Sequence, residues 1–400
     1  MKIAFVYDGL YPYLKGGIER RNYELATRLS DRHEVHYITW RHWGAARRAP
    51  HDGFTVHGVG APRPFYGDDG KRTVGEATAF AMRLLPALRQ RQYDVIDCSA
   101  TPYLPLYSCA LAARLTRTPL IATWHEFWGD HWTAYLPERP VVARIAQRLE
   151  AGCRPLGDIR VAVSPFTARR LAEGPGGVTA RVVGNGVSLD AIKRIAPSGE
   201  PSDIVFVGRL IDDKKVDVLL QAVHRLLGEF PGIRCTIVGD GPERDHLERL
   251  TASLSLGEHV RFTGHVEDGQ TFASMKAAKV FALPSIREGF GITVIEAQAS
   301  GCVPVVARGA HTAAPDLVRH DVDGLVCDPT PESLASSLGS LLRDPGRQAS
   351  MKAQAERSAL KSDWDSLARD IEDIYSEAVA DGRRARATRA QVSPAETSAK

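Results

Sequence analysis

One stretch in the second half of the chain decides the fold: KVFALPSIREGFGITVIEAQASGCVPVVAR, residues 279–308. Two short apolar runs, 279–284 and 303–308, enclose a loop and a helical segment, and Gly301 follows that segment as a residue that favours a helix end. Runs that are apolar at consecutive positions are typical of strands in a parallel sheet covered on both faces. The stretch therefore predicts one strand–helix–strand unit of an α/β sheet.

The same pattern recurs along all 400 residues, which is more than one hydrophobic core usually serves. The stretch 188–203 is rich in Pro, Ser and Gly and lacks a sustained period, which indicates a linker. We therefore predict two tandem doubly wound, Rossmann-like domains, 1–190 and 203–361. Their strands are expected at 2–7, 34–40, 54–59, 93–98, 119–124, 159–164, 181–186, 203–208, 234–239, 260–264, 279–284, 303–308 and 324–329.

The end of the chain has a different pattern. Residues 362–380 predict a helix with one wide apolar face, which includes Trp364, Leu367 and Ile371 and should pack against a domain. Residues 382–400 carry basic side chains without apolar periodicity, so we expect a disordered basic tail.

The composition excludes several classes of protein. The 51 Lys and Arg nearly balance the 48 Asp and Glu, which argues against a dedicated nucleic-acid binder. The six cysteines are scattered without a C-x-x-C or a Cys/His cluster, which favours a reducing compartment. No segment is long and apolar enough to span a bilayer, and the first residues resemble a buried strand rather than a signal peptide. We therefore expect a cytoplasmic protein.

Charge is divided unevenly along the chain. Residues 1–190 hold 25 Lys and Arg against 18 Asp and Glu, whereas residues 191–381 hold 21 against 29. The basic excess of the first half, together with Trp40 and Trp43, suits a lipid-linked or anionic acceptor and peripheral contact with the inner face of a membrane. The same residues suit a hydrated soluble face equally well.

The loop after the strand 279–284 carries the sharpest chemical signal. Glu288, Gly289 and Gly291 lie between a strand end and a helix N-terminus, whose bare N–H groups and dipole favour an anion. Glu296 follows eight residues after Glu288, and two carboxylates beside a phosphate site suit a ligand with many hydroxyls.

Two further turns offer similar chemistry. Arg209 and Lys214 follow the strand 203–208 and suit a diphosphate, and the pair Gly16-Gly17 opens a helix after the first strand. His125 ends the run 119–124 and starts an aromatic segment that contains Trp124, Trp128 and Trp132. These aromatic residues either stack on an acceptor or form core, and the sequence leaves both alternatives open.

Together these residues resemble glycosyltransferase family 4, the retaining nucleotide-sugar enzymes of GT-B fold. The resemblance covers almost the whole chain and is most specific over EGFGITVIEAQASGCVPVV, residues 288–306. It also implies that the helix 362–380 crosses back onto the first domain. Its other segments are KGGIERRNYELATRL (15–29), TWHEFWG (123–129), VSPFTARRL (163–171), VVGNGVSLD (182–190), FVGRLIDDKK (206–215) and IVGDGPE (237–243).

The resemblance implies a role for each matching residue. His125 would line the donor sugar, Arg209 and Lys214 would hold the diphosphate, Glu288 would bind sugar hydroxyls, and Glu296 the ribose. Of these, His125, Arg209, Lys214 and Glu288 form the expected catalytic set. The remaining donor-binding positions would be Gly16, Gly17, Gly208, Gly264, His265, Val266, Gly289, Phe290, Gly291, Ile292 and Thr293.

The resemblance implies a retaining hexosyltransferase that uses a nucleoside-diphosphate sugar, an unidentified sugar, lipid-linked or small-molecule acceptor, and no cofactor. The tripeptides Asp321-Val322-Asp323 and Asp363-Trp364-Asp365 do not follow a buried strand at the expected site, so we expect no essential metal. Lys215 departs from the family pattern, because Gly is common at that position.

Three other functions compete with this interpretation. A nicotinamide- or flavin-dependent oxidoreductase would need G-x-G-x-x-G after the first strand, and DGLYPYLKGG (8–17) lacks it. A nucleotide-sugar epimerase of the same architecture and a non-catalytic nucleotide-sugar-binding homologue remain as alternatives.

Overall fold

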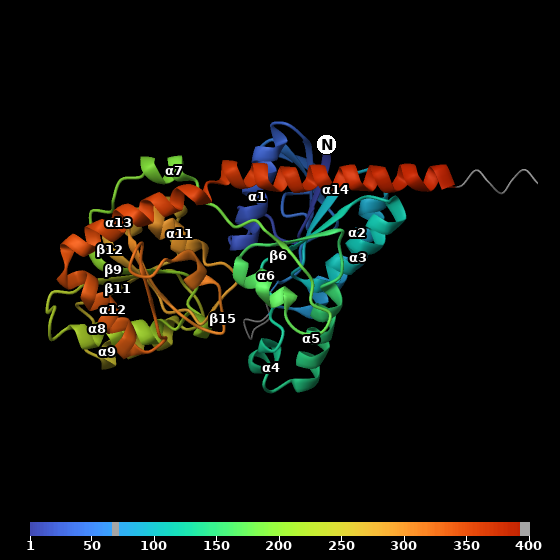
Figure 1. Ribbon diagram of the computed structural model, residues 1–400. Coiled ribbons are helices and arrows are strands. Elements are labelled where there is room, and N and C mark those ends of the chain that lie inside the picture. Colours follow the sequence, from blue (N-terminus) through green and yellow to red (C-terminus); the bar gives the residue numbers. More distant parts are fainter. Residues whose placement is uncertain (66–71, 393–400) are drawn as a thin grey trace, which may run out of the picture. The chain divides into compact units, whose positions relative to one another are not determined.

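The computed structural model describes residues 1–65 and 72–392, and the chain divides into two compact units (Figure 1). Unit 1 contains Met1–Gly184 together with the chain from Asp365 onward, and unit 2 contains Asn185–Trp364. The change of unit after Gly184 precedes the stretch 188–203 that we expected as a linker, and part of that stretch forms the short helix α7 (Leu189–Arg194). Each unit contains a largely parallel sheet with helices, which confirms the predicted α/β class.

Within the described residues, unit 1 is built on one sheet with the strand order β3-β4-β2-β1-β5-β6-β7-β8. Neighbouring strands pair in parallel, except that β3 runs antiparallel to β4. The central strands β5 and β6 are buried at every position, as their predominantly apolar sequences predict. The strands are β1 (Lys2–Val6), β2 (Glu34–Thr39), β3 (Arg48–His51), β4 (Phe54–Gly58), β5 (Val95–Ser99), β6 (Leu120–Trp124), β7 (Ile159–Ala162) and β8 (Arg181–Val182).

Start signals in the sequence mark the beginning of some helices of unit 1. α6, for example, follows Ser164, whose side chain accepts a hydrogen bond from the Thr167 N–H, and has Pro165 in its first turn. The helices are α1 (Gly17–Ser30), α2 (Val74–Arg89), α3 (Tyr103–Thr116), α4 (His131–Tyr135), α5 (Pro140–Cys153), α6 (Pro165–Ala172) and α14 (Trp364–Val392).

The long helix α14, red in Figure 1, returns the end of the chain to unit 1. Tyr375 is buried and its hydroxyl donates to Asp97 on β5, while Arg32 beyond α1 pairs with Glu372 at 2.6 Å. α14 continues to Val392, past residue 380 where the apolar face ends. The expected tail 382–400 is therefore helical up to Val392, because its Arg and Ala residues are strong helix formers that extend an existing helix at little cost. Residues 393–400 lie outside the described residues.

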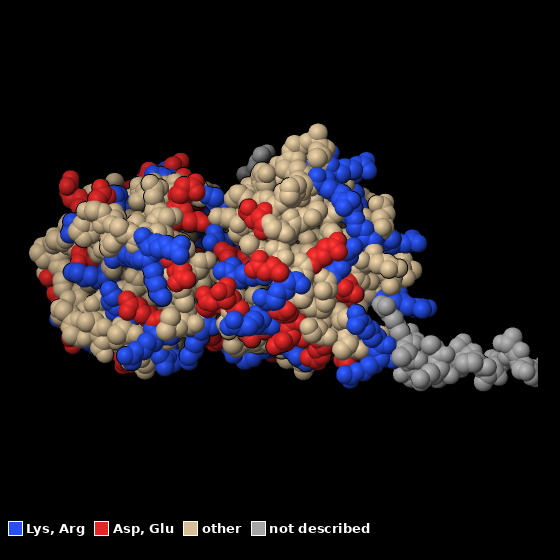
Figure 2. All heavy atoms as spheres, turned by 90° about the horizontal axis from the view of Figure 1, so that it is seen from above, with Lys and Arg blue, Asp and Glu red and all other residues tan. Residues whose placement is uncertain are grey.

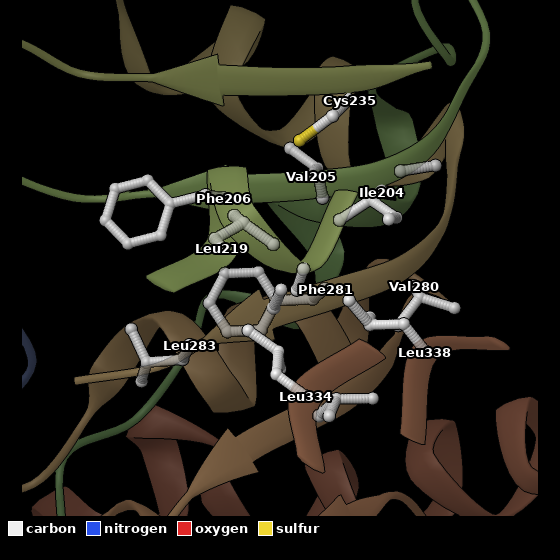
Figure 3. Packing of buried hydrophobic residues seen from close by; sticks show 14 of the residues in the cluster. Ile204, Val205, Phe206, Leu219, Cys235, Val280, Phe281, Leu283, Leu334 and Leu338 are labelled. Carbon is white, nitrogen blue, oxygen red and sulfur yellow. The ribbon is translucent and has the colours of Figure 1, made fainter. Parts of the chain in front are cut away.

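Unit 2 is built on a parallel sheet with the strand order β11-β10-β9-β12-β14-β16 in the described chain. Figure 3 shows its core, in which Phe206 on β9 and Phe281 on β12 lie near Leu219 from α8 and Leu334 from α12. A separate ladder joins β13 and β15. The strands are β9 (Ser202–Val207), β10 (Cys235–Val238), β11 (Val260–Gly264), β12 (Ala278–Leu283), β13 (Arg287–Glu288), β14 (Val303–Ala307), β15 (His311–Thr312) and β16 (Leu325–Cys327).

The helices of unit 2 connect these strands in the order that a doubly wound sheet requires. They are α7, α8 (Val216–Leu226), α9 (Arg244–Ser253), α10 (Asp268–Lys276), α11 (Ile292–Ala299), α12 (Pro331–Arg343) and α13 (Pro345–Ala359), with the 3₁₀ turns η1 (Asp212–Lys214), η2 (Ala314–Leu317) and η3 (Leu360–Ser362). Among the residues described, no helix combines the length and apolar character that crossing a membrane requires.

Charged side chains of both signs are interspersed over much of the face drawn in Figure 2. This surface agrees with the near balance of 51 basic and 48 acidic residues in the sequence. Among the described residues, many surface charges are paired, as Arg343 is with Glu229 and Arg225 with Glu332. Ion pairs that are this exposed to solvent contribute little to the free energy of folding, and their charges mainly keep the protein soluble.

Candidate functional site

The glycine-rich loop of unit 2 leads from the end of β12 into α11. Gly291 precedes the helix with φ of +91°, a left-handed conformation that glycine adopts at little cost. α11 begins at Ile292, so the N–H groups of Ile292 and Thr293 lie in its first turn, where the helix dipole favours an anion. The structure thus places a helix N-terminus at the carboxyl end of β12, in the position that the sequence predicts.

A short ladder outside the main sheet fixes the backbone at Glu288. β13 pairs in parallel with β15, so that Glu288 lies opposite Thr312. The Ala313 N–H also donates to the Glu288 carbonyl at 2.7 Å. This ladder was not predicted, because two-residue strands leave no periodic signal in a sequence.

The structure brings Lys214 and Glu288 together across 74 positions of sequence. Lys214 ends η1, in the turn after β9, and its Nζ donates to Glu288 Oε1 in an ion pair. The Lys214 side chain is 19% exposed and the Glu288 side chain is 12% exposed, so both groups remain in contact with water. A charged pair of this kind can exchange one partner for a ligand phosphate or hydroxyl.

Other predicted donor residues of unit 2 lie at the carboxyl ends of β9 and β11 or on α11. Gly208 and the exposed Arg209 follow β9, Gly264 ends β11 and is followed by the exposed His265, and Glu296 lies half-buried on α11. Carboxyl ends of parallel strands form one edge of a sheet, which is where open α/β sheets bind ligands.

Asp213 and Arg287 were not among the predicted site residues, yet they lie directly beside Lys214 and Glu288. Arg287 Nε donates to Asp213 Oδ2 at 2.7 Å. The Asp213 carbonyl also accepts from the Ile286 N–H at 3.0 Å. No sequence signal marks this pair, because its partners come from two segments that only the fold brings together.

Glycines allow the turns after β9 and β10 to touch. Gly239 has φ of +133°, and a Cβ there would lie 1.9 Å from the Gly208 carbonyl oxygen. A Cβ at Gly241 would lie 2.3 Å from the Leu210 carbonyl oxygen, and the Leu210 N–H donates to the Asp240 carbonyl. The turn GDGP therefore supports the backbone of the basic turn rather than acting only as a generic turn.

Lys215 adopts a left-handed conformation, with φ of +49°. An L-residue with a Cβ is strained there, which explains physically why glycine is common at this position in the family that the sequence resembles. The Lys215 Nζ pairs with Asp212 at 2.6 Å.

In unit 1, His125 follows β6 and is 7% exposed. Its Nε2 lies 3.2 Å from the Ser99 hydroxyl, Asn22 donates to Ser99 at 3.3 Å, and Tyr37 donates to the Gly9 carbonyl at 2.9 Å. Burial, helped by the nearby Arg21 charge, lowers the pKa of His125 to about 3. His125 is therefore a neutral imidazole in a network of neutral groups at physiological pH.

The predicted anion site at Gly16-Gly17 faces an acidic group of its own chain. Gly16 caps α1 with extended backbone, and Gly17 is its first residue. A Cβ at Gly16 would lie 2.5 Å from Glu19 Oε2, and one at Gly9 would lie 2.7 Å from Glu19 Oε1. The Glu19 carboxyl group thus lies at this helix N-terminus, and burial raises its pKa.

The aromatic segment after His125 is organised by a buried carboxylate that sequence reasoning missed. Glu150 on α5 accepts from the Tyr103 hydroxyl at 2.6 Å, from the Trp128 and Gly129 N–H groups at 2.7 Å, and from Trp132 Nε1 at 3.1 Å. Trp124 is fully buried, whereas Trp128 and Trp132 are half-buried. Of the two alternatives for the aromatic residues, stacking on an acceptor or forming core, Trp124 therefore follows the second.

Trp40, expected beside a lipid-linked acceptor, is also a core residue. It is fully buried, and its Nε1 donates to Glu76 Oε1 at 2.6 Å. Burial, with the nearby Asp8 carboxylate, raises the pKa of Glu76 to about 7.

Across the described residues, no group of three or more His, Cys, Asp or Glu side chains is placed to hold a metal ion.

Two family models match the chain in adjoining segments. The model described as Glycosyltransferase Family 4 matches residues 15–191, and the model described as Glycosyl transferases group 1 matches residues 189–358. The division between the models lies close to the change from unit 1 to unit 2.

Curated relatives share part or most of this length. The D-inositol 3-phosphate glycosyltransferase of Salinispora tropica is 39% identical over 193 residues, which are 45% of this chain and 39% of that protein. The phosphatidyl-myo-inositol mannosyltransferase of Mycolicibacterium smegmatis is 27% identical over 378 residues, or 90% of each chain. The chain thus spans less than half the length of the first relative and nine-tenths of the second.

Solved structures share the fold. Sucrose-phosphate synthase from Thermosynechococcus elongatus superimposes with a TM-score of 0.78 at 19% identity, covering 94% of this chain and 99% of that one. HepE from Anabaena in complex with UDP superimposes with a TM-score of 0.72 at 21% identity, covering 94% and 100%. At these identities the likeness shows the GT-B architecture.

Proposed function

Because the chain belongs to glycosyltransferase family 4, we propose that it moves a hexosyl-type sugar from a nucleoside-diphosphate sugar to an acceptor hydroxyl, with retention of anomeric configuration and without an essential metal. The observation that carries the proposal is the Lys214–Glu288 pair beside the N-terminus of α11. It supplies, in one place, a cation for a diphosphate and a carboxylate for sugar hydroxyls.

Unit 2 would bind the donor. Lys214 and Arg209 would stabilise the negative charge that grows on the diphosphate as the glycosidic bond breaks, together with the N–H groups at the start of α11. Glu288 would accept hydrogen bonds from sugar hydroxyls and Glu296 from the ribose. Preorganised cations and N–H groups can perform this stabilisation without a metal ion.

Unit 1 would contribute His125 to the sugar. With its pKa lowered to about 3, the His125 imidazole is a weak base at neutral pH and serves better as a hydrogen-bonding group. An inverting transfer needs a base at the acceptor hydroxyl, whereas in a retaining transfer the departing phosphate can accept that proton itself. The neutral His125 therefore supports the retaining route.

The direct test is incubation with a panel of nucleotide sugars and acceptors, with released nucleoside diphosphate measured by chromatography. Proton and carbon NMR of the anomeric position in donor and product, with a chelator present, should show retention. An inverted product, or activity that disappears with chelator and returns with Mg²⁺ or Mn²⁺, would overturn the mechanism. A changed sugar without acceptor would indicate an epimerase, and binding without turnover a non-catalytic homologue.

We further propose a cyclitol phosphate as acceptor, either soluble or carried by a lipid. Two relatives are named for D-inositol 3-phosphate and for phosphatidyl-myo-inositol, and residues 1–190 have an excess of seven positive charges, from 25 basic and 18 acidic residues. Assays with D-inositol 3-phosphate and with phosphatidylinositol vesicles distinguish the two sources. Nucleotide release with unphosphorylated sugars alone would reject the phosphate requirement.

A surface of α5 supports peripheral contact with the cytoplasmic face of an anionic membrane. Val141, Val142 and Ile145 are 65%, 42% and 52% exposed, and Arg144 and Arg148 on the same helix are exposed beside them. Exposed apolar side chains with flanking arginines are typical of helices that lie in a lipid interface.

Co-sedimentation with phosphatidylcholine vesicles, with and without phosphatidylglycerol, tests this contact. The V141D/I145D double variant should lose binding to the anionic vesicles while staying folded. The V74D/M82D double variant on α2, at side chains that are 69% and 70% exposed, provides a matched control because it also places two negative charges at exposed apolar positions. Equal losses in both variants would reject α5 as the specific contact.

A further inference from the structure

Two consecutive ion pairs join the same two segments of unit 2. Asp213 pairs with Arg287, and the next residue of each segment, Lys214 and Glu288, forms the next pair. One segment is the 3₁₀ turn η1 after β9, and the other is β13, in the loop between β12 and α11. The order of residues is the same on both sides, so one pair sets the register of the other.

Asp213 binds the loop with its backbone as well as its side chain. Its carbonyl accepts from the Ile286 N–H at 3.0 Å and from the Ser285 hydroxyl at 3.2 Å. The Ser285 hydroxyl lies 3.1 Å from the Arg287 carbonyl. The residues directly before Glu288 are therefore fastened to Asp213 at several successive positions.

The burial of the pair suits a positioning role. The Arg287 and Asp213 side chains are 20% and 19% exposed, and Nε and Oδ2 are 2.7 Å apart. By comparison, the side chains of the Arg343–Glu229 pair in the same unit are 55% and 44% exposed. An exposed pair is screened and readily replaced by water. The Lys214–Glu288 pair is shielded to a similar degree, so the feature that sets Asp213 apart is that its carbonyl also accepts hydrogen bonds from the loop.

We infer that Asp213 and Arg287 are positioning residues for the proposed donor site. They hold the basic turn and the glycine-rich loop in register when a donor takes over the Lys214–Glu288 contact, so that the Glu288 carboxylate stays where the sugar hydroxyls arrive. The fastening of the loop by Asp213 follows from the contacts within unit 2, whereas its effect on sugar binding rests on the proposed function.

Loss of a positioning residue should change sugar binding and turnover in a way that a simple loss of stability does not. Neutralising Asp213 leaves the Lys214 cation, so binding of a nucleoside diphosphate should stay within about twofold of the native protein. The sugar-dependent part should fall instead: the gain in affinity from UDP to UDP-glucose, or from GDP to GDP-mannose, should shrink and kcat should drop about tenfold. If the pair were merely structural, its loss would leave both the affinity gain and kcat unchanged in the folded protein.

The experiment compares the native chain with Asp213→Asn, the charge-exchanged double variant D213R/R287D, and Glu229→Gln as a matched control from the exposed pair. The first readout needs no ligand: amide hydrogen exchange of the peptide covering 285–291 should quicken in Asp213→Asn, recover in the double variant, and stay native in Glu229→Gln. Calorimetry with UDP, GDP and their sugar conjugates, followed by kcat and KM, gives the second.

The outcomes separate the inference from the proposed function. Native protein that binds none of these nucleotides would refute the proposed function, and the exchange rates would still decide whether Asp213 fastens the loop. Native exchange in Asp213→Asn, or an unchanged affinity gain from diphosphate to nucleotide sugar, would overturn the positioning role. Unfolding of Asp213→Asn is checked by circular dichroism, and recovery in the double variant then remains the decisive result.

Discussion

The candidate sites of the two units hold their polar groups in opposite ways. In unit 2, Lys214 and Glu288 form an ion pair that keeps 19% and 12% of its exposure and connects two separate turns. In unit 1, His125 is 7% exposed and lies in hydrogen-bond contact with the Ser99 hydroxyl. One arrangement is a charged pair that retains partial contact with water, and the other is neutral and buried.

The two sheets thus carry polar groups of two kinds at the ends of their strands, and each kind suits a different ligand group. A charged pair near water can exchange partners with an anion, because neither charge is left unpaired in a dry interior during the exchange. A buried network of neutral groups fixes shape and direction, and its charge does not change near neutral pH. We therefore expect changes in unit 2 to alter charge stabilisation, and changes near His125 to alter how the sugar is held.

The largest effect should follow removal of the unit 2 cation. Lys214→Ala should lower kcat/KM about 100- to 1000-fold, because charge grows on the leaving diphosphate in the transition state and its stabilisation is lost. Steady-state kinetics with the identified donor measures this loss. Lys215→Ala removes the adjacent lysine, which pairs with Asp212, and should have a much smaller effect. Equal losses in both variants would mean that the turn acts only through its general charge.

The next largest effect is expected at Glu296, the carboxylate proposed to bind the ribose. Glu296→Gln keeps the shape of the side chain but removes its charge, so donor affinity should weaken by about 1.5–3 kcal/mol, the usual range for hydrogen bonds to charged groups. Calorimetry with the nucleoside diphosphate measures this change. Glu332→Gln, at an exposed glutamate of α12 that pairs with Arg225, is the control. Native affinity in Glu296→Gln would remove this residue from the site.

The buried histidines of unit 1 should make folding acid-sensitive. Burial lowers the pKa of His57, with help from Arg91 and His36, to about 3, and burial beside Arg21 does the same for His125. Both groups bind protons more readily when unfolded, so their contribution to stability is complete above about pH 6.5 and is lost as the pH falls toward 3. From pH 7 to pH 5 this loss should be on the order of 2 kcal/mol for each histidine.

Urea unfolding of the native chain and of His57→Gln at both pH values tests the acid sensitivity. The variant lacks one of the two titrating groups, so its free energy of unfolding should fall less between pH 7 and pH 5. The same fall in both proteins would show that His57 is not held neutral in the folded state.

A smaller kinetic effect is expected at the neutral site. His125→Ala should lower kcat by more than about tenfold while nucleotide binding stays nearly native, because the proposed contact is to the sugar. Since the pKa of His125 lies at about 3, the pH profile of kcat/KM should show no loss from this group between pH 5 and pH 8. A limb near pH 6.5 that disappears in the variant would contradict the neutral network.

The smallest effect concerns backbone strain in the basic turn. Lys215→Gly should stabilise unit 2 by up to about 1 kcal/mol, because the left-handed conformation at φ of +49° costs a residue with a Cβ. Arg117→Gly, at φ of +56° after α3, should give a similar gain in unit 1. Thermal unfolding measures both, and a loss of stability in both variants would show that these conformations carry no strain.

The sequence predicts most of the fold because regular elements leave periodic traces. Short runs rich in apolar residues, such as 93–98 and 279–284, correspond to the largely buried strands β5 and β12. β3 was missed, since RAPH is short, half-exposed and contains a proline at an edge of the sheet. The predicted strand 181–186 is reduced to the two residues of β8 for a similar reason, because an edge position leaves both residues exposed.

Local sequence patterns were enough to predict the α/β class, the succession of most strands and helices along the chain, and the residue types at the candidate donor site. These features depend on local periodicity and on glycine and charge next to strand ends. Tertiary structure alone decided which of those charges meet. Lys214 reaches Glu288, Asp213 reaches Arg287, and Glu150 organises the tryptophans after His125, all through contacts between segments far apart in sequence. The physical reason is that a side chain's partner and its exposure to water are set by how elements pack, and packing leaves no periodic trace in either segment.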